Sequence, residues 1–148
     1  MRPASLADAA ILADVHASAF ETPWSAADIA AVLEGPGAFG LVARGERGEA
    51  AGFILCRAVA GEAEILTLAV RPDHRRHGLA RALTETAAGI AASAACEAMF
   101  LEVAADNPGA IALYEQTGFA SVGRRAGYYG RASGSSIDAI VMRRALNT

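Results

Sequence analysis

Residues 70–81 place basic and small side chains directly after an apolar segment, in a stretch that reads VRPDHRRHGLAR. We expect a helix to begin inside this stretch. The first N–H groups of a helix have no partner within it, and the helix dipole places partial positive charge at that end. The small residues Gly78 and Ala80 leave this backbone open to a ligand. Further positive charge comes from Arg75, Arg76 and Arg81. The pattern predicts a loop that binds a diphosphate, and the alternative is a strand–turn–helix whose arginines face only solvent.

Two further residues have side chains suited to proton transfer. Glu102 lies inside the apolar segment 99–103, and Tyr114 lies in a helix expected at 107–118. A carboxylate can take up a proton as a general base, and a phenol can give one up as a general acid. On spacing alone the favoured alternatives are structural: Glu102 as the outward residue of an alternating strand, and Tyr114 as an amphipathic core residue.

The elements that would position these residues are marked by caps and helix breakers. Asn107 followed by Pro108 indicates a helix start, and Gly118 indicates its end. Two pairs have the spacing of a capping box, Ser5 with Asp8 and Ser25 with Asp28. We expect helices at residues 6–20, 25–35, 78–95 and 107–118, and strands at 39–43, 50–59, 63–70, 99–103, 119–127 and 137–143. This order predicts a single α/β domain over residues 1–148, with a central mixed β-sheet flanked by helices.

Size and composition narrow the classes of function. The chain has 148 residues, 53% of them hydrophobic, with a formal net charge of -3 and a pI near 5.6. This balance argues against nucleic-acid binding and mildly favours a basic peptide or a cationic amine as partner. The sequence shows neither a signal peptide nor an apolar stretch long enough to span a bilayer, so we expect a cytoplasmic protein that does not contact a membrane. Nothing in the pattern predicts an oligomeric state.

The cysteines and histidines are expected to have secondary roles. Cys56 and Cys96 lack the spacing of metal ligands, so we expect buried thiols and no metal site. His74 and His77 flank the diphosphate loop and are expected to border the anion. In the first helix, His16 is expected to face solvent, away from the apolar face formed by Ile11, Leu12, Val15 and Ala19.

The loop pattern V-x-P-x-x-R-x-x-G-x-A resembles the acetyl-CoA motif of the GNAT acetyltransferases, and it lacks the glycines and lysine of other phosphate-binding loops. The resemblance implies the GNAT fold, acetyl-CoA as cosubstrate and no metal. It further implies that the CoA pyrophosphate binds at Arg75, Arg76, His77, Gly78, Leu79, Ala80 and Arg81. The backbone of Leu68, Ala69 and Val70 would then run beside the pantetheine arm and stabilise the oxyanion.

The pattern L-E-V-x-x-x-N-x-x-A-I-x-L-Y-E-x-x-G-F is similar to the ribosomal-protein alanine N-acetyltransferases within that family. The similarity implies Glu102 as general base, Tyr114 as general acid and a cofactor contact at Asn107, in a direct transfer. The P-W-S and Y-Y motifs support the same branch and imply acceptor-binding roles for Trp24, Tyr128 and Tyr129. The implied acceptor is a protein N-terminus, namely the N-terminal alanine of a ribosomal protein of the S18 type.

Two other functions stay open at the level of sequence. The same fold can acetylate a small-molecule amine, because function rests on the acceptor site rather than the fold. A non-catalytic sensor that binds acyl-CoA is the second alternative, and the presence of both Glu102 and Tyr114 argues against it. The Gly- and Ser-rich segment 130–136 is expected to form a loop beside the acceptor, and it leaves the choice of acceptor open.

Overall fold

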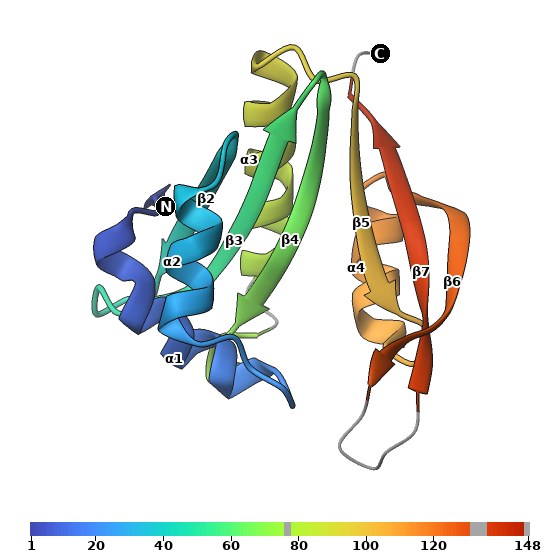
Figure 1. The fold of residues 1–148 in the computed structure, drawn as a ribbon. Coiled ribbons are helices and arrows are strands. Elements are labelled where there is room, and N and C mark those ends of the chain that lie inside the picture. Colours follow the sequence, from blue (N-terminus) through green and yellow to red (C-terminus); the bar gives the residue numbers. More distant parts are fainter. Residues whose placement is uncertain (76–77, 131–135, 147–148) are drawn as a thin grey trace.

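The computed structural model describes residues 1–75, 78–130 and 136–146, which form a seven-stranded mixed sheet with helices on both faces (Figure 1). The strand order is β1-β2-β3-β4-β5-β7-β6. The strands are β1 (Arg2–Pro3), β2 (Ala38–Arg44), β3 (Ala50–Val59), β4 (Glu62–Val70), β5 (Ala98–Ala104), β6 (Ala120–Gly130) and β7 (Ser136–Ala145). The helices are α1 (Ala9–Ala19), α2 (Ala26–Glu34), α3 (Leu79–Ser93) and α4 (Pro108–Gln116), with 3-10 turns at Leu6–Asp8 and Pro72–His74. The mixed α/β class predicted from the sequence is confirmed.

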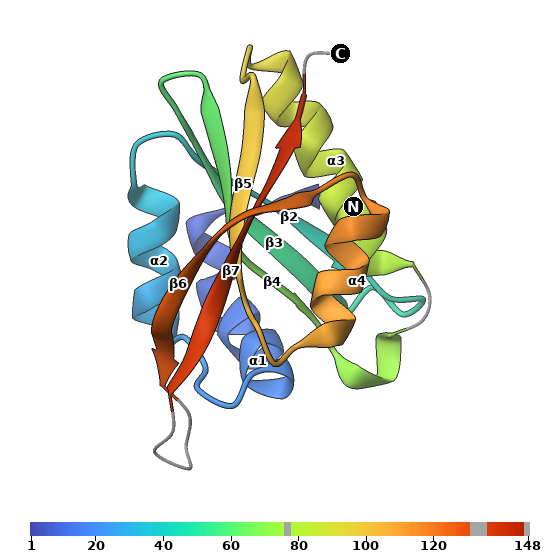
Figure 2. The same ribbon diagram turned by 90° about the vertical axis from the view of Figure 1, so that its right-hand side faces the viewer.

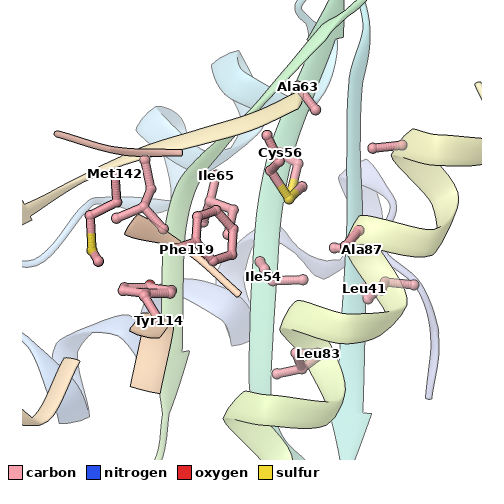
Figure 3. Close-up of a cluster of buried hydrophobic side chains, with 14 of the residues drawn as sticks. Leu41, Ile54, Cys56, Ala63, Ile65, Leu83, Ala87, Tyr114, Phe119 and Met142 are labelled. Atoms are coloured by element: carbon pink, nitrogen blue, oxygen red, sulfur yellow. The ribbon is translucent and has the colours of Figure 1, made fainter. Parts of the chain in front are cut away.

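Alternation along the central strands builds a hydrophobic core on each face of the sheet. On β3, Phe53 and Leu55 point toward α1 and α2, whereas Ile54 and Cys56 point toward α3 (Figure 3). All four side chains are fully buried. Burial raises the pKa of the Cys56 thiol to about 12, so this cysteine is an inert core residue, as expected, and Cys96 is buried as well.

The caps read from the sequence form as predicted. At the start of α2 the Asp28 N–H donates to Ser25 Oγ at 3.1 Å, and the Ser25 N–H donates to Asp28 Oδ2 at 3.0 Å. At the N-terminus, Asp8 accepts from the Ser5 N–H at 2.8 Å and also pairs with Arg2. The reciprocal bonds of Ser25 and Asp28 satisfy N–H groups at the start of α2, whereas Ser5 and Asp8 bracket the 3-10 turn Leu6–Asp8, so that α1 begins only at Ala9 and not directly after Ser5 as expected.

Strands β4 and β5 diverge along their length. They pair in parallel over residues 62–64 and 98–100, where the ladder ends at Glu64 and Phe100. Beyond this point β5 continues to pair with β7, and β4 with β3, so the two strands separate like the arms of a V (Figure 1). The backbone of Leu68, Ala69 and Val70 lies on the arm of β4, where its edge toward β5 has no ladder partner among the described residues. Such an edge offers N–H and C=O groups to a ligand.

His16 corrects an expectation from the sequence. Its side chain is only 1% exposed, and it lies between β4 and the segment that joins α1 to α2. His16 Nε2 lies 3.0 Å from Thr67 Oγ1, and Nδ1 accepts from the Trp24 N–H at 3.1 Å. The ring also stacks on Phe20. His16 was expected to face solvent, but hydrogen bonds to both ring nitrogens satisfy the polar atoms and allow burial. Ile11, expected in the core, is instead 39% exposed.

Acid should destabilise the protein through His16. Burial lowers the pKa of His16 from 6.5 to about 4. Between these values the unfolded chain binds a proton that the folded protein excludes, so the free energy of unfolding falls as the pH falls through this window. From pH 7 to pH 5 this loss amounts to about 2 kcal/mol. We expect His16→Gln, which cannot titrate, to lose that share of the pH dependence in urea unfolding experiments.

His74→Gln is a control that should change the pH dependence of the free energy of unfolding in the opposite direction. The pKa of His74 is raised by its bonds to Glu49 and Asp73, so His74 stabilises the fold at low pH and loses this contribution as the pH rises. Its removal should make stability fall more steeply on acidification. An unchanged pH dependence in His16→Gln would show that His16 titrates in the folded protein as it does in the unfolded chain.

Candidate active site

The backbone at the start of α3 is open and has N–H groups without a partner inside the helix. Gly78 is its N-cap residue, with a positive φ of 74° that favours glycine, and a Cβ added there would meet no atom within 4 Å. The first hydrogen bond of the helix runs from the Ala82 N–H to the Gly78 carbonyl at 2.9 Å, so the N–H groups before Ala82 have no partner inside the helix. Leu79 and Ala80 pack on the core below, and Arg81 is exposed. This geometry fits the diphosphate predicted to bind at residues 75–81.

Arginine side chains tie the loop before α3 to the ends of the strands. Arg75 Nε donates to the Val70 carbonyl at 3.3 Å, and Arg71 Nε donates to the Ala50 carbonyl at 2.9 Å. Arg75 therefore joins the loop to the arm of β4, and its side chain remains largely exposed. Arg76 and His77, which the sequence also assigned to the loop, lie outside the described residues.

His74 contacts carboxylates in this structure. Its Nε2 lies 2.9 Å from Glu49 Oε1, and its Nδ1 lies 3.1 Å from Asp73 Oδ1. The two neighbours raise the pKa of His74, Glu49 most of all. Both ring nitrogens thus face carboxylate oxygens, and the contact with Glu49 ties the loop to the turn between β2 and β3.

Glu102 lies near the point where β4 and β5 diverge. Its neighbours Leu101 and Val103 belong to the core under α3 and α4, so the alternation of β5 directs Glu102 to the opposite face. There Glu102 Oε1 accepts from Arg125 Nη1 at 2.7 Å. The Arg125 guanidinium in turn lies 4.0 Å from the centroid of the Tyr128 ring. The Glu102 side chain is 23% exposed, which leaves it within reach of a ligand.

A cavity of about 310 Å³ adjoins Glu102 on this face of the sheet. Phe100 and Val141 contribute apolar surface, and Glu64 and Arg57 form an ion pair at 3.0 Å beside them. The remaining lining residues are Val59, Glu62, Ala63 and Leu101. A concave site with apolar walls and a few charged groups is typical of a substrate pocket, so we take it as the candidate acceptor cavity.

Tyr114 lies on the other face of the sheet, in α4, where it is 8% exposed and packs in the core (Figure 3). Two bonds that end α4 hold it: the Phe119 N–H donates to the Tyr114 carbonyl at 2.9 Å, and the Gly118 N–H donates to the Glu115 carbonyl at 3.3 Å. Gly118 has a φ of 92°, as such a helix end requires. The Phe119 ring packs edge-on against the Tyr114 ring, with 5.7 Å between the ring centroids. The predicted C-cap glycine thus fixes the position of the tyrosine.

The structure separates the remaining predicted site residues. Asn107 caps α4, with its Oδ1 accepting from the Ala110 N–H at 3.1 Å. Trp24 is half-buried and stacks on His16 at 5.3 Å between ring centroids, so it packs in the core under α1 and α2 and does not line the cavity described above. Tyr128 is 48% exposed and contacts Arg125, which brings it close to Glu102. The side chain of Tyr129 lies outside what the structure describes.

Arg125 is the site residue that the sequence analysis missed. It contacts Glu102 across 23 residues, from β6, which pairs with β7 and not with β5 (Figure 2). The sequence does hint at such a partner, because Glu102 is a carboxylate on a largely apolar strand and a partly buried carboxylate usually has a cationic partner. The sequence does not show which of the thirteen arginines is that partner.

The comparison with protein families agrees with the fold and with the motif of the loop before α3. The sequence profile of the acetyltransferase (GNAT) family matches residues 9–119, and the chain belongs to this family. GNAT acetyltransferases use acetyl-CoA, and the open start of α3 fits its diphosphate. Among residues 1–75, 78–130 and 136–146, no group of three or more His, Cys, Asp or Glu side chains is arranged to hold a metal ion.

Two relatives and one solved structure refine this similarity. The ribosomal protein bS18-alanine N-acetyltransferase of Escherichia coli strain K12 is 39% identical over 97 residues, which cover 66% of this chain and 65% of that protein, slightly less than two thirds of its length. The putative enzyme of that name from Bacillus subtilis strain 168 is 29% identical over 130 residues, covering 87% of this chain and 83% of that protein. The crystal structure of the E. coli ribosomal-protein-S18-alanine N-acetyltransferase superimposes with a TM-score of 0.90 at 31% identity, covering 98% of this chain and 92% of that one.

Proposed function

We propose that this protein transfers the acetyl group of acetyl-CoA to the N-terminal α-amine of a protein, and that the acceptor is the N-terminal alanine of a ribosomal protein of the S18 type. One observation carries the proposal. A carboxylate and a phenol, Glu102 and Tyr114, lie on opposite faces of the sheet beside the diverging strands β4 and β5, and the first residues of α3 pack on the same core cluster as Tyr114. The relatives named for this reaction support the choice of acceptor. Location in the cytoplasm belongs to the same proposal; in the described parts of the chain, no helix is long and apolar enough to cross a membrane.

The geometry supports direct transfer between the two faces. Acetyl-CoA would lie along the open edge of β4, with its diphosphate at the start of α3. On the acceptor face Glu102 takes a proton from the α-ammonium, directly or through water, and the neutral amine attacks the thioester carbonyl. Backbone N–H groups near Leu68, Ala69 and Val70 stabilise the oxyanion. The C–N bond forms and the C–S bond breaks, and Tyr114 protonates the departing thiolate. The nitrogen of the former amine loses its second proton to water, and proton exchange with solvent returns Tyr114 to the phenol and Glu102 to the carboxylate.

The decisive test is the release of CoA thiol from acetyl-CoA in the presence of an alanine-initiated peptide from the S18 N-terminus. We expect turnover on this peptide and none on the same peptide blocked at its α-amine. Turnover only on small amines would replace the proposed acceptor with a small-molecule one. Acetyl-CoA binding in calorimetry without turnover on any amine would leave a sensor, and the proposal would be wrong.

The diphosphate site can be tested separately at Gly78. We expect Gly78→Ala to weaken acetyl-CoA binding about tenfold in calorimetry, because the new Cβ enters the space open to the anion and the backbone φ disfavours alanine. Gly61 provides a matched control. It has a φ of 82° with nothing within 4 Å, but it lies in the turn between β3 and β4. Gly61→Ala should cost similar stability and leave affinity unchanged. Equal loss of affinity in both variants would remove Gly78 from the diphosphate site.

A further inference from the structure

Arg125 contacts two residues of the candidate acceptor site at once. Its Nη1 donates to Glu102 Oε1 at 2.7 Å, and its guanidinium lies 4.0 Å from the centroid of the Tyr128 ring. Glu102 and Tyr128 both favour the charged arginine, Glu102 most strongly, and the pKa of Arg125 is raised accordingly. A carboxylate beside the face of an aromatic ring is a binding place for a cation, and in this structure an arginine of the chain fills it.

The acceptor amine, like Arg125, needs the carboxylate of Glu102 as its partner. Before transfer it is an ammonium ion, and it must come within hydrogen-bonding distance of Glu102, or of a water molecule bound there, to lose its proton. Both cations carry one positive charge, and a carboxylate oxygen that accepts from a guanidinium at 2.7 Å is hindered from accepting from an ammonium in the same direction. The contacts of Arg125 therefore compete with binding of the acceptor.

We propose that Arg125 is an internal competitor of the acceptor: it occupies a cation subsite formed by the Glu102 carboxylate and the Tyr128 ring, and the acceptor ammonium enters by displacing it. The inference rests on the proposed function, because it takes Glu102 to be the group that receives the proton. It adds to that function a binding subsite for a protonated amine, and it makes Arg125 a residue that weakens the apparent affinity for the acceptor.

The surroundings of Arg125 allow it to leave at low cost. It lies on β6, the outermost strand, where the register with β7 shifts between Arg125 and Tyr129 (Figure 2). At this irregularity Gly127 has a φ of 61°, and its N–H donates to Asp138 Oδ1 at 2.9 Å. The Arg125 side chain is 53% exposed, so a displaced guanidinium is readily solvated. Exposed ion pairs of this kind contribute little to stability.

Two other arginines near the cavity have contacts of their own. Arg57 pairs with Glu64 at 3.0 Å, and the Arg143 guanidinium lies 5.9 Å from the centroid of the Phe100 ring. When Arg125 leaves, Glu102 is the carboxylate whose contact it gives up, at the edge of the cavity that would hold the acceptor. The arriving ammonium thus replaces one positive charge with another, and the local charge balance is kept.

The test is the steady-state kinetics of Arg125→Ala with the alanine-initiated peptide. We expect the KM for the peptide to fall about three- to tenfold, with the affinity for acetyl-CoA unchanged. Methylguanidinium at millimolar concentration should then act as a competitive inhibitor against the peptide in this variant and should have little effect on the wild type. Arg124→Ala is the matched control, because the neighbouring Arg124 pairs with Asp138 at 2.6 Å rather than with Glu102. Arg124→Ala should change neither the KM for the peptide nor the inhibition by methylguanidinium.

Several results would overturn the inference. A rise in the KM of Arg125→Ala would show that Arg125 binds the acceptor, and an unchanged KM without inhibition by methylguanidinium would show that no subsite is freed. If Arg125→Ala fails to fold, Arg125→Gln gives the same comparison. If the wild type acetylates no peptide, the proposed function is wrong; the subsite is then judged by NMR titration with ethylamine, which should bind Arg125→Ala and not the double variant Arg125→Ala with Glu102→Gln.

Discussion

Replacing Glu102 by glutamine is expected to lower kcat by about 10²- to 10⁴-fold, the usual contribution of a general base. The amide keeps the size and the hydrogen-bonding capacity of the side chain but cannot take up the proton of the acceptor. Glu102 lies on the face opposite the core that holds α3, so the start of α3 should be undisturbed. We therefore expect the dissociation constant of acetyl-CoA, measured by calorimetry, to change by less than about twofold.

A suitable control is Glu85→Gln, which removes a carboxylate from another ion pair. Glu85 lies on α3 and contacts Arg144 at 2.9 Å, away from the proposed chemistry. Its kcat should stay close to that of the wild type, so the comparison separates proton transfer from the general loss of an ion pair. Full kcat in Glu102→Gln at neutral pH would remove Glu102 from the mechanism.

The elements of the fold were predictable because their ends depend on local chemistry. Asn107 with Pro108 begins α4 and Gly118 follows its end, through bonds between residues that are close in sequence. The same holds for Ser25 at the start of α2. Strand β1 was missed because two residues, Arg2–Pro3, are too few to show an alternating pattern.

Contacts between distant residues could not be predicted in the same way. His16 is buried because Thr67, 51 residues away, supplies a hydrogen-bonding partner, and no pattern within α1 indicates this. The ion pair of Glu102 with Arg125 depends on the order of β5, β7 and β6 in the sheet. The divergence of β4 from β5 also results from the pairing of the whole sheet, and no local motif indicates where the ladder between them ends. Motifs thus indicated the candidate residues, and the topology of the sheet determined which of them meet.

Tyr114→Phe is expected to lower kcat by about 10²-fold or more, because the thiolate would leave without a general acid. The substitution keeps the ring, its edge-on contact with Phe119 at 5.7 Å and the backbone bonds that end α4. Stability and acetyl-CoA affinity should therefore stay near the wild-type values. The measurements are kcat with the alanine-initiated peptide and the midpoint of urea unfolding.

These two measurements separate the chemical role of Tyr114 from its packing role. Tyr114→Leu would remove the ring as well as the hydroxyl, and the buried aromatic contact would be lost together with its share of the core, at a cost of about 1–3 kcal/mol. If the hydroxyl acts as the acid, phenylalanine and leucine variants lose kcat to a similar degree while only the leucine variant loses stability. If the tyrosine serves packing alone, kcat follows stability, and Tyr114→Phe retains full activity. The second outcome would leave protonation of the thiolate to solvent and the mechanism with Glu102 as its single proton-transfer group.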